Sequence, residues 1–161
     1  MADLPSAPGV YALVLLLEGP LRVEVMGRAW LLEPGCYVYV GSARGPGGLR
    51  ARVSRHLRRG KRLRWHVDRL TEAARVEYVV YALAGRECDL VPPLEGLGFR
   101  HPIPGFGASD CRQGCSSHLL SCPCGLAECL RAVEAAFRAA GLEPESVAVS
   151  EPKGQLLPTA P

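Results

Sequence analysis

Residues 36–60 read CYVYVGSARGPGGLRARVSRHLRRG, and this stretch decides the predicted fold. Its first five residues are β-branched or aromatic apart from one cysteine, and this composition favours a strand. The glycines and the proline at 45–48 predict a loop. Residues 49–59 then predict an amphipathic helix that ends at Gly60. The apolar positions of this helix, one turn apart, are Leu49, Val53 and Leu57.

Two strand-favouring stretches, Val10–Leu17 and Leu21–Leu32, precede this region. Gly19-Pro20 between them predicts a turn, so that the two stretches form a hairpin. With residues 36–40 as the third strand, the sequence predicts a three-stranded antiparallel sheet flanked by helices. The fold class is therefore α+β.

The rest of the chain predicts mainly helices and loops. We expect a helix over 63–71, a strand over 76–83, and a short segment that Glu87 opens and Pro92-Pro93 stops. An irregular loop rich in glycine, proline, serine and cysteine follows over 101–124, and then an amphipathic helix over 126–140. We expect one domain over 1–142, with a core over about 5–100, a Cys/His-rich loop over 101–124 and a C-terminal helix over 125–141. A flexible Pro-containing tail follows over 143–161.

The positive charge of the chain is concentrated in one region. The formal net charge is only +3, yet there is no acidic residue between Glu33 and Asp68. The nine basic residues in that interval are Arg44, Arg50, Arg52, Arg55, Arg58, Arg59, Lys61, Arg62 and Arg64. Such a cluster favours contacts with nucleic-acid phosphates that carry little sequence preference. The alternative is a solvated helix face.

No apolar stretch is long enough to span a membrane, and the N-terminus has no basic region typical of a signal peptide. The sequence therefore predicts a cytoplasmic protein.

Two short motifs and the helix after them resemble a known family. Gly9-Val10-Tyr11 and Tyr39-Val40-Gly41 are each common tripeptides, but here an arginine-rich helix with Arg52 and His56 follows the second. This layout resembles the GIY-YIG nuclease superfamily. The small prokaryotic Uri-like branch is the most similar, over roughly residues 5 to 120. The segments that carry this second resemblance are Trp65-His66-Val67-Asp68, Glu87-Cys88-Asp89-Leu90, residues 105–111 (GFGASDC) and Ser117-His118-Leu119.

The resemblance implies a metal-dependent DNA endonuclease with five catalytic residues: Tyr11, Tyr39, Arg52, His56 and Glu87. It assigns Glu87 to a Mg²⁺ or Mn²⁺ ion, and one carboxylate suffices because Mg²⁺ keeps several waters and binds substrate phosphate. Arg52 suits the scissile phosphate, because a guanidinium can bind two oxygens at once.

Tyr11 is the expected general base or water-orienting group, with a pKa lowered by nearby positive charge. Tyr39 is expected to bind the phosphate or Tyr11, and His56 to share the proton transfer. For Tyr11 alone the alternative is a tyrosine at the edge of the core; for His56 it is packing. Tyr37 lies on the same strand face as Tyr39, and the Tyr-Val-Gly register favours Tyr39.

The predicted partner is DNA, held by residues of the glycine loop and the basic region. Gly41 is expected to allow a phosphate backbone close to the sheet, although a simple turn glycine explains it equally. The other predicted nucleic-acid-binding residues are Ser42, Arg44, Arg50, Arg55, Arg59, Lys61, Arg62 and His66.

Seven cysteines, an odd number, cannot all be paired within the chain. Several lie near His118 in the predicted loop, and a structural Zn²⁺ site is one interpretation. Its candidate ligands are Cys111, Cys115, His118 and Cys122. The alternatives are small buried cysteines or a disulfide between Cys111 and Cys115.

Two other functions remain compatible with the sequence. The first is a non-catalytic nucleic-acid-binding module, and the second is a zinc-stabilised protein-interaction domain.

Overall fold

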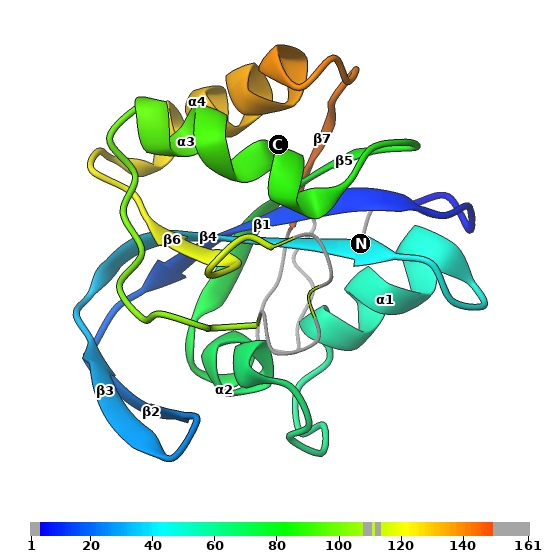
Figure 1. Cartoon of the computed structure of the whole chain (residues 1–161). Helices are drawn as coiled ribbons and strands as arrows, with labels where there is room; N and C mark the ends of the chain where they lie inside the picture. Colours follow the sequence, from blue (N-terminus) through cyan, green and yellow to red (C-terminus); the bar gives the residue numbers. More distant parts are fainter. Residues whose placement is uncertain (1–3, 108–110, 112–113, 150–161) are drawn as a thin grey trace.

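A computed structural model describes residues 4–107, 111 and 114–149 of the chain (Figure 1). Its centre is a five-stranded sheet in which every neighbouring pair is antiparallel. In order across the sheet, the strands are β6 (Leu119–Ser121), β4 (Gly35–Ala43), β1 (Gly9–Leu17), β5 (Arg75–Ala82) and β7 (Glu145–Ala148). The α+β class is confirmed. The expectation of a three-stranded sheet is wrong, because β5, β6 and β7 also join.

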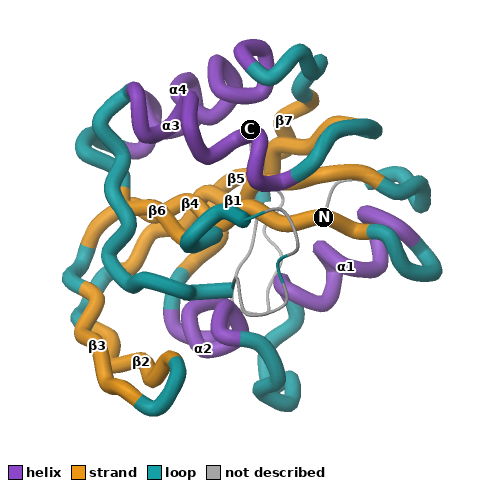
Figure 2. The backbone as a smooth tube through the Cα atoms, viewed as in Figure 1, coloured by secondary structure: helices purple, strands orange, loops and turns teal. Residues whose placement is uncertain are grey.

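Helices cover both faces of this sheet, as the tube view in Figure 2 shows. Helices α1 (Gly48–Leu57) and α2 (His66–Ala73) lie on one face. Helices α3 (Val91–Gly96) and α4 (Leu126–Ala139) lie on the other, and a short 3-10 helix, η1 (Glu87–Leu90), leads into α3. The predicted helices over 49–59 and 126–140 are confirmed, while α2 begins three residues later than expected.

Strand β1 is central and buried on both faces. Successive side chains of a strand point to opposite sides, so alternate residues of β1 enter different cores. Tyr11, Leu13 and Leu15 pack in the cluster that contains Leu49 and Val53 of α1. Their neighbours Val10, Ala12 and Val14 pack in the cluster that contains residues of α3 and α4. The almost continuous apolar run of β1 therefore serves two cores, and Tyr11 belongs to the layer beneath α1 and α2.

The predicted hairpin around Gly19-Pro20 does not form. Strand β1 pairs with β4 and β5 instead. The stretch after the turn divides into β2 (Leu21–Val25) and β3 (Arg28–Leu32), which form a separate two-stranded hairpin. The reason is the turn at Met26-Gly27, where both residues have positive φ, of 55° and 77°. Two consecutive residues of this kind match the right-handed twist of a tight hairpin.

Pro92 and Pro93 do not stop the segment that begins at Glu87. They occupy the first turn of α3, where backbone N–H groups have no intrahelical partner. The N–H that proline lacks therefore costs the helix no hydrogen bond.

Two segments predicted as loop or tail contribute edge strands. Residues 119–121, expected within the irregular loop, form β6 on β4. Residues 145–148, expected within the flexible tail, form β7 on β5. The rest of that tail, from residue 150 onward, lies outside the described residues. No helix in the described part of the chain is long and apolar enough to cross a membrane.

Candidate functional site

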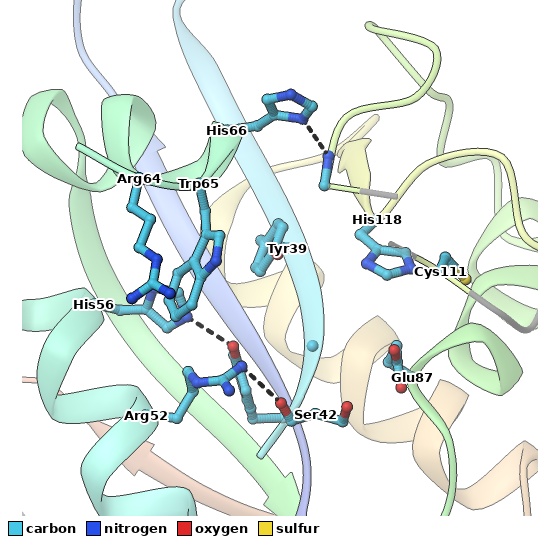
Figure 3. Close-up of a pocket in the computed structure, with 13 residues that line it drawn as sticks. Tyr39, Ser42, Arg52, His56, Arg64, Trp65, His66, Glu87, Cys111 and His118 are labelled. Atoms are coloured by element: carbon cyan, nitrogen blue, oxygen red, sulfur yellow. Dashed lines mark hydrogen bonds between the residues drawn. The ribbon is translucent and has the colours of Figure 1, made fainter. Parts of the chain in front are cut away.

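A pocket of about 340 Å³ brings together all five predicted catalytic residues. Tyr11 comes from β1, Tyr39 from β4, Arg52 and His56 from α1, and Glu87 from η1. In Figure 3, Arg52, His56 and Trp65 lie on one side, Glu87 and His118 on the other, and Tyr39 between them. These five residues, which span 76 positions of the chain (from 11 to 87), thus line one site.

The register of β1 against β4 sets the two tyrosines side by side. Tyr11 is opposite Gly41, and Tyr39 is opposite Leu13, two residues away along β1. Both phenols therefore emerge on the same face of the sheet. Tyr37 is on that face too, but its hydroxyl donates to the Glu33 carbonyl at 2.5 Å and does not line the pocket.

Two glycines leave space for these phenol rings. A Cβ on Gly41 would lie 2.5 Å from the Tyr11 hydroxyl oxygen. A Cβ on Gly107, whose φ is +70°, would lie 2.9 Å from a ring carbon of Tyr39. Gly41 is thus explained by the packing of Tyr11, and the structure does not require a phosphate to account for it.

Tyr11 and His56 form a buried hydrogen-bonded pair. The Tyr11 hydroxyl lies 2.7 Å from Nε2 of His56, and the two side chains are almost fully buried. Burial, helped by the charge of Arg52, lowers the pKa of His56 to about 3. Burial also raises the pKa of Tyr11 above its usual value, and the charge of Arg52 offsets only part of this effect. The expectation that positive charge lowers the Tyr11 pKa is therefore wrong.

Arg52 is held at the pocket by two neighbours. Its Nη1 donates to the Ser42 carbonyl at 3.0 Å, and its guanidinium carbon lies 4.9 Å from the centre of the Trp65 ring. The guanidinium carbons of Arg55 and Arg64 also lie near this ring, at 4.2 and 5.7 Å from its centre. An arginine cation over an indole face is attracted by the ring quadrupole. Trp65 was not predicted as a site residue, although it opens the Trp-His-Val-Asp motif.

Asp68 fixes the segment that carries Trp65. Its carboxylate accepts hydrogen bonds from the Arg55 guanidinium at 2.7 and 2.9 Å. It also accepts from the backbone N–H groups of Arg64 and Trp65, at 2.6 and 2.8 Å. Burial alone would raise the pKa of this carboxyl, but these hydrogen bonds prevail and lower it to about 2. Asp68 therefore anchors α2 to α1 as an ionised group.

Several predicted nucleic-acid-binding residues have structural partners within the chain. Lys61 is only 8% exposed, and its ammonium contacts Glu72 at 2.9 Å and two backbone carbonyls. It is not a surface contact for DNA, contrary to the prediction. Arg55 binds Asp68, as described above. The exposed members of the predicted set are Arg44, Arg50, Arg59 and Arg62, of which all but Arg62 also donate to a backbone carbonyl.

Three further members of that set line the pocket itself: Gly41, Ser42 and His66. Nδ1 of His66 accepts a hydrogen bond from the Gly107 N–H at 2.8 Å. Gly107 lines the pocket as well, so this contact joins α2 to the loop that closes the other side.

Glu87 is the one acidic side chain among the described residues that line the pocket. It lies at the start of η1 and is 9% exposed. A carboxylate oxygen is the type of ligand that Mg²⁺ and Mn²⁺ prefer, and such ions complete their coordination with water.

Next to Glu87, Cys88 belongs to a group that is able to hold a metal ion such as zinc. Its members are Cys88, Cys111, Cys115 and His118, and their ligand atoms all lie within 4.8 Å of one another. Three of the four residues predicted as zinc ligands, Cys111, Cys115 and His118, belong to this group, and Cys122 does not. Cys122 lies instead beside Cys124, with their sulfurs 3.3 Å apart, and Cys88 of η1 takes its place. The sequence separation between Cys88 and the loop concealed this fourth member of the group.

Comparison with protein families matches residues 10–141 to one described as "Domain of unknown function DUF123". Searches of curated proteins and of solved structures found no match. The matched residues include both strand motifs, the basic helix, η1 and the Cys/His group. Because the match spans most of the chain, the protein belongs to the DUF123 family.

Proposed function

We propose that this protein is a metal-dependent endonuclease that hydrolyses DNA phosphodiester bonds by a GIY-YIG-type mechanism. The observation that carries the proposal is the convergence of five side chains in one pocket: Tyr11, Tyr39, Arg52, His56 and Glu87. These residues come from four separate elements, so no local pattern places them together. They combine a cation, a carboxylate and groups able to accept or donate a proton. Phosphodiester hydrolysis requires functional groups of these three kinds.

Arg52 is positioned to bind the phosphate that is cleaved. One of its terminal nitrogens donates to the Ser42 carbonyl, and Trp65 supports the face of the guanidinium. These contacts and a hydrogen bond with Tyr11 pre-organise the cation. A guanidinium has five N–H donors, so it is also able to bind phosphate oxygens. Charge that develops on phosphorus oxygens in the transition state then meets a cation that needs little rearrangement.

Tyr11 orients the attacking water as a neutral phenol. Because burial raises its pKa, Tyr11 keeps its proton at neutral pH. Its oxygen accepts a hydrogen bond from water while its O–H donates to Nε2 of His56, 2.7 Å away. As water attacks phosphorus, its proton passes to the Tyr11 oxygen and the phenolic proton passes to His56. Tyr39, beside this pair, contacts the phosphate from the neighbouring strand.

Glu87 is the proposed ligand of a divalent ion, Mg²⁺ or Mn²⁺, whose charge would stabilise the oxygen that leaves phosphorus. Figure 3 shows its carboxylate across the pocket from Arg52. A scissile phosphate bound between them would therefore contact Arg52 on one side and face Glu87 on the other.

The exposed arginines supply the proposed binding surface for the DNA backbone. Arg44 and Arg50 flank the start of α1, and Arg62 and Arg64 precede α2. Contacts of this kind position the duplex and do not read its sequence.

The first test is the cleavage of supercoiled, branched and single-stranded DNAs with Mg²⁺ or Mn²⁺ by the wild-type chain and by Glu87→Gln. The substitution keeps the size of the side chain and removes its charge. We expect the rate constant to fall by at least about 100-fold, because the stabilisation that a metal supplies is worth several kcal/mol.

Asp89→Asn is the matched control, since Asp89 lies in the same short helix and is exposed. It should cleave at the wild-type rate. If the wild-type chain binds DNA in a salt-sensitive way but cleaves no substrate, the proposed endonuclease activity is refuted. That result would favour a non-catalytic binding module.

The pH profile of cleavage is a second expected result. His56 accepts a proton only in its neutral form, and burial lowers its pKa from 6.5 to about 3. Arg52, Arg55 and Lys61 oppose its protonation, and Asp68 only partly counters them. The single-turnover rate should therefore stay level as pH falls through 6.5. An inflection near pH 6.5 that vanishes in His56→Gln would show that the imidazole titrates normally and would contradict this assignment.

A further inference from the structure

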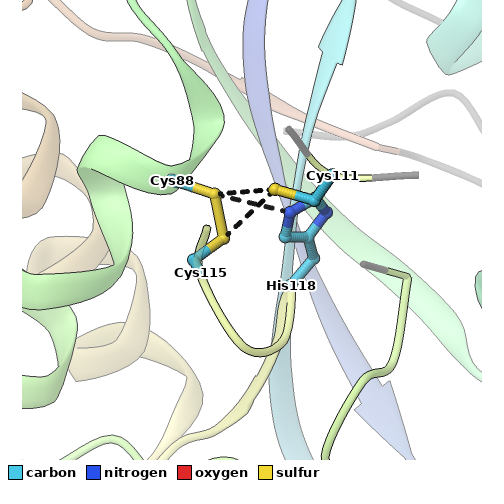
Figure 4. Close-up of side chains that lie close together, drawn as sticks. All are labelled: Cys88, Cys111, Cys115 and His118. Atoms are coloured by element: carbon cyan, nitrogen blue, oxygen red, sulfur yellow. Dashed lines mark hydrogen bonds between the residues drawn. A yellow bond between two sulfur atoms is a disulfide. The ribbon is translucent and has the colours of Figure 1, made fainter. Parts of the chain in front are cut away.

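The Cys/His group beside the pocket gathers four side chains that are able to hold a metal ion. Figure 4 shows Cys88, Cys111, Cys115 and His118 converging on one point. Zinc binds thiolate sulfur at about 2.3 Å and imidazole nitrogen at about 2.0 Å, which places ligand atoms of a tetrahedron roughly 3.5 to 3.8 Å apart. The Cys88 and Cys111 sulfurs are 3.4 Å apart, and those of Cys111 and Cys115 are 3.9 Å apart. Nε2 of His118 is 3.6 Å from the Cys88 sulfur.

A disulfide alone does not account for this arrangement. The structure joins Cys88 to Cys115 by a disulfide, which uses two of the four groups. It gives no reason for the Cys111 sulfur to lie 3.4 and 3.9 Å from these two sulfurs, or for Nε2 of His118 to lie 3.6 Å from the Cys88 sulfur. A four-ligand metal site accounts for the presence of Cys111 and His118 beside these two sulfurs. The disulfide and the metal site use the same sulfurs, so the metal site belongs to the reduced chain.

We propose that Cys88, Cys111, Cys115 and His118 of the reduced protein bind one structural Zn²⁺ ion through three thiolates and Nε2 of the histidine. Four protein ligands close the coordination sphere, as in structural zinc sites, and leave no position for a reacting water. Three thiolates with one neutral imidazole give the site a net charge of about −1. It is thus distinct from the proposed Mg²⁺ or Mn²⁺ position at Glu87, and it does not depend on the nuclease assignment.

This zinc ion would join segments that are distant in the chain. Cys88 belongs to η1, Cys111 and Cys115 to the loop after Gly107, and His118 directly precedes β6. Backbone hydrogen bonds already tie that loop to itself, from Gly105 to Ser116 at 2.8 Å and from His118 to Phe106 at 2.8 Å. The zinc ion would add the connection to η1. Because Cys88 follows Glu87 directly, this connection also fixes the carboxylate that lines the pocket.

The test uses the full chain, purified in the presence of a phosphine reductant and without chelator. Zinc is measured by mass spectrometry of the dissolved metal, and X-ray absorption identifies its ligands. We expect about one zinc ion per chain, bound by three sulfurs and one nitrogen. Reduced wild-type protein that retains less than about one tenth of an equivalent of zinc, and that shows no sulfur-to-metal charge-transfer band when titrated with Co²⁺, would overturn the proposal.

Variants then assign the ligands. Cys88→Ser and His118→Asn should each lower zinc content at least about tenfold after dialysis against a weak chelator, since each removes one ligand. Cys122→Ser and Cys124→Ser are the matched controls, because these neighbouring thiols lie outside the group and should retain the wild-type zinc content. Zinc loss in the controls with retention in Cys88→Ser would assign the metal elsewhere. The Co²⁺ spectrum of the wild-type chain keeps the proposal testable if a variant fails to fold.

Discussion

Arg52→Lys is expected to lower the single-turnover rate constant for DNA cleavage by about 1,000-fold, within the range measured for arginines that stabilise phosphoryl transfer. Lysine keeps the positive charge but loses the planar fork that binds two oxygens. It also loses the flat surface that packs over Trp65, 4.9 Å away, and the geometry of the bond to the Ser42 carbonyl. The measurement is quenched-flow cleavage at saturating enzyme, so that weaker DNA binding does not contribute.

Arg58→Lys is the control for this experiment, because Arg58 directly follows the same helix and its side chain is exposed. It should cleave at nearly the wild-type rate. Equal losses in both variants would mean that the helix contributes only general positive charge. That result would remove Arg52 from the proposed catalytic residues.

Asp68→Ala is expected to have the largest effect on stability, lowering the free energy of unfolding by about 3 kcal/mol. The substitution leaves the Arg55 guanidinium and the N–H groups of Arg64 and Trp65 without the acceptor that they share. The Asp68 side chain is fully buried, so little water replaces it. Urea denaturation monitored by the two tryptophans measures the change.

The pH dependence of this contribution has a definite sign. The pKa of Asp68 falls from 3.8 to about 2 on folding, so the folded state favours the ionised carboxylate. The stabilisation is fully present above pH 3.8 and is lost as pH falls toward 2. Asp68→Ala should therefore differ from wild type most at neutral pH, and the difference should shrink in acid.

Glu18→Ala is the comparison for an exposed ion pair. Glu18 lies 3.5 Å from Arg75, and its side chain is 69% exposed. We expect a change below about 1 kcal/mol, the usual limit for surface pairs. An Asp68→Ala effect as small as this one would show that the Asp68 network does not stabilise the fold.

Local patterns predicted the elements whose hydrogen bonds and apolar faces are local. Helix α1 follows from Leu49, Val53 and Leu57, because a helix closes its hydrogen bonds within one turn and shows its buried face as a period in the sequence. Helix α4 follows for the same reason. The strands β1, β4 and β5 were expected from their composition, but composition does not say which strand pairs with which.

The errors concern contacts between distant residues. Strand β1 was expected to pair with the next stretch, and it pairs with β4 and β5 instead. As a buried central strand it needs a neighbour on each edge, so that its backbone N–H and C=O groups are all hydrogen-bonded. The edge strands β6 and β7 are only three and four residues long, and they become strands by pairing with β4 and β5. Lys61 was expected at the surface, and its ion pair with Glu72 became visible only once α2 was in place.

By itself, then, the sequence determined the α+β class and the basic helix, and its resemblance to the GIY-YIG superfamily pointed to five of the residues that line the pocket. Only the tertiary structure decided the order of strands, the support of Arg52 by Trp65, and the place of Cys88 beside Cys111, Cys115 and His118. The physical reason is the same in each case. Burial, strand pairing and metal ligation depend on distances in space, and residues separated by many positions acquire those distances only when the chain folds.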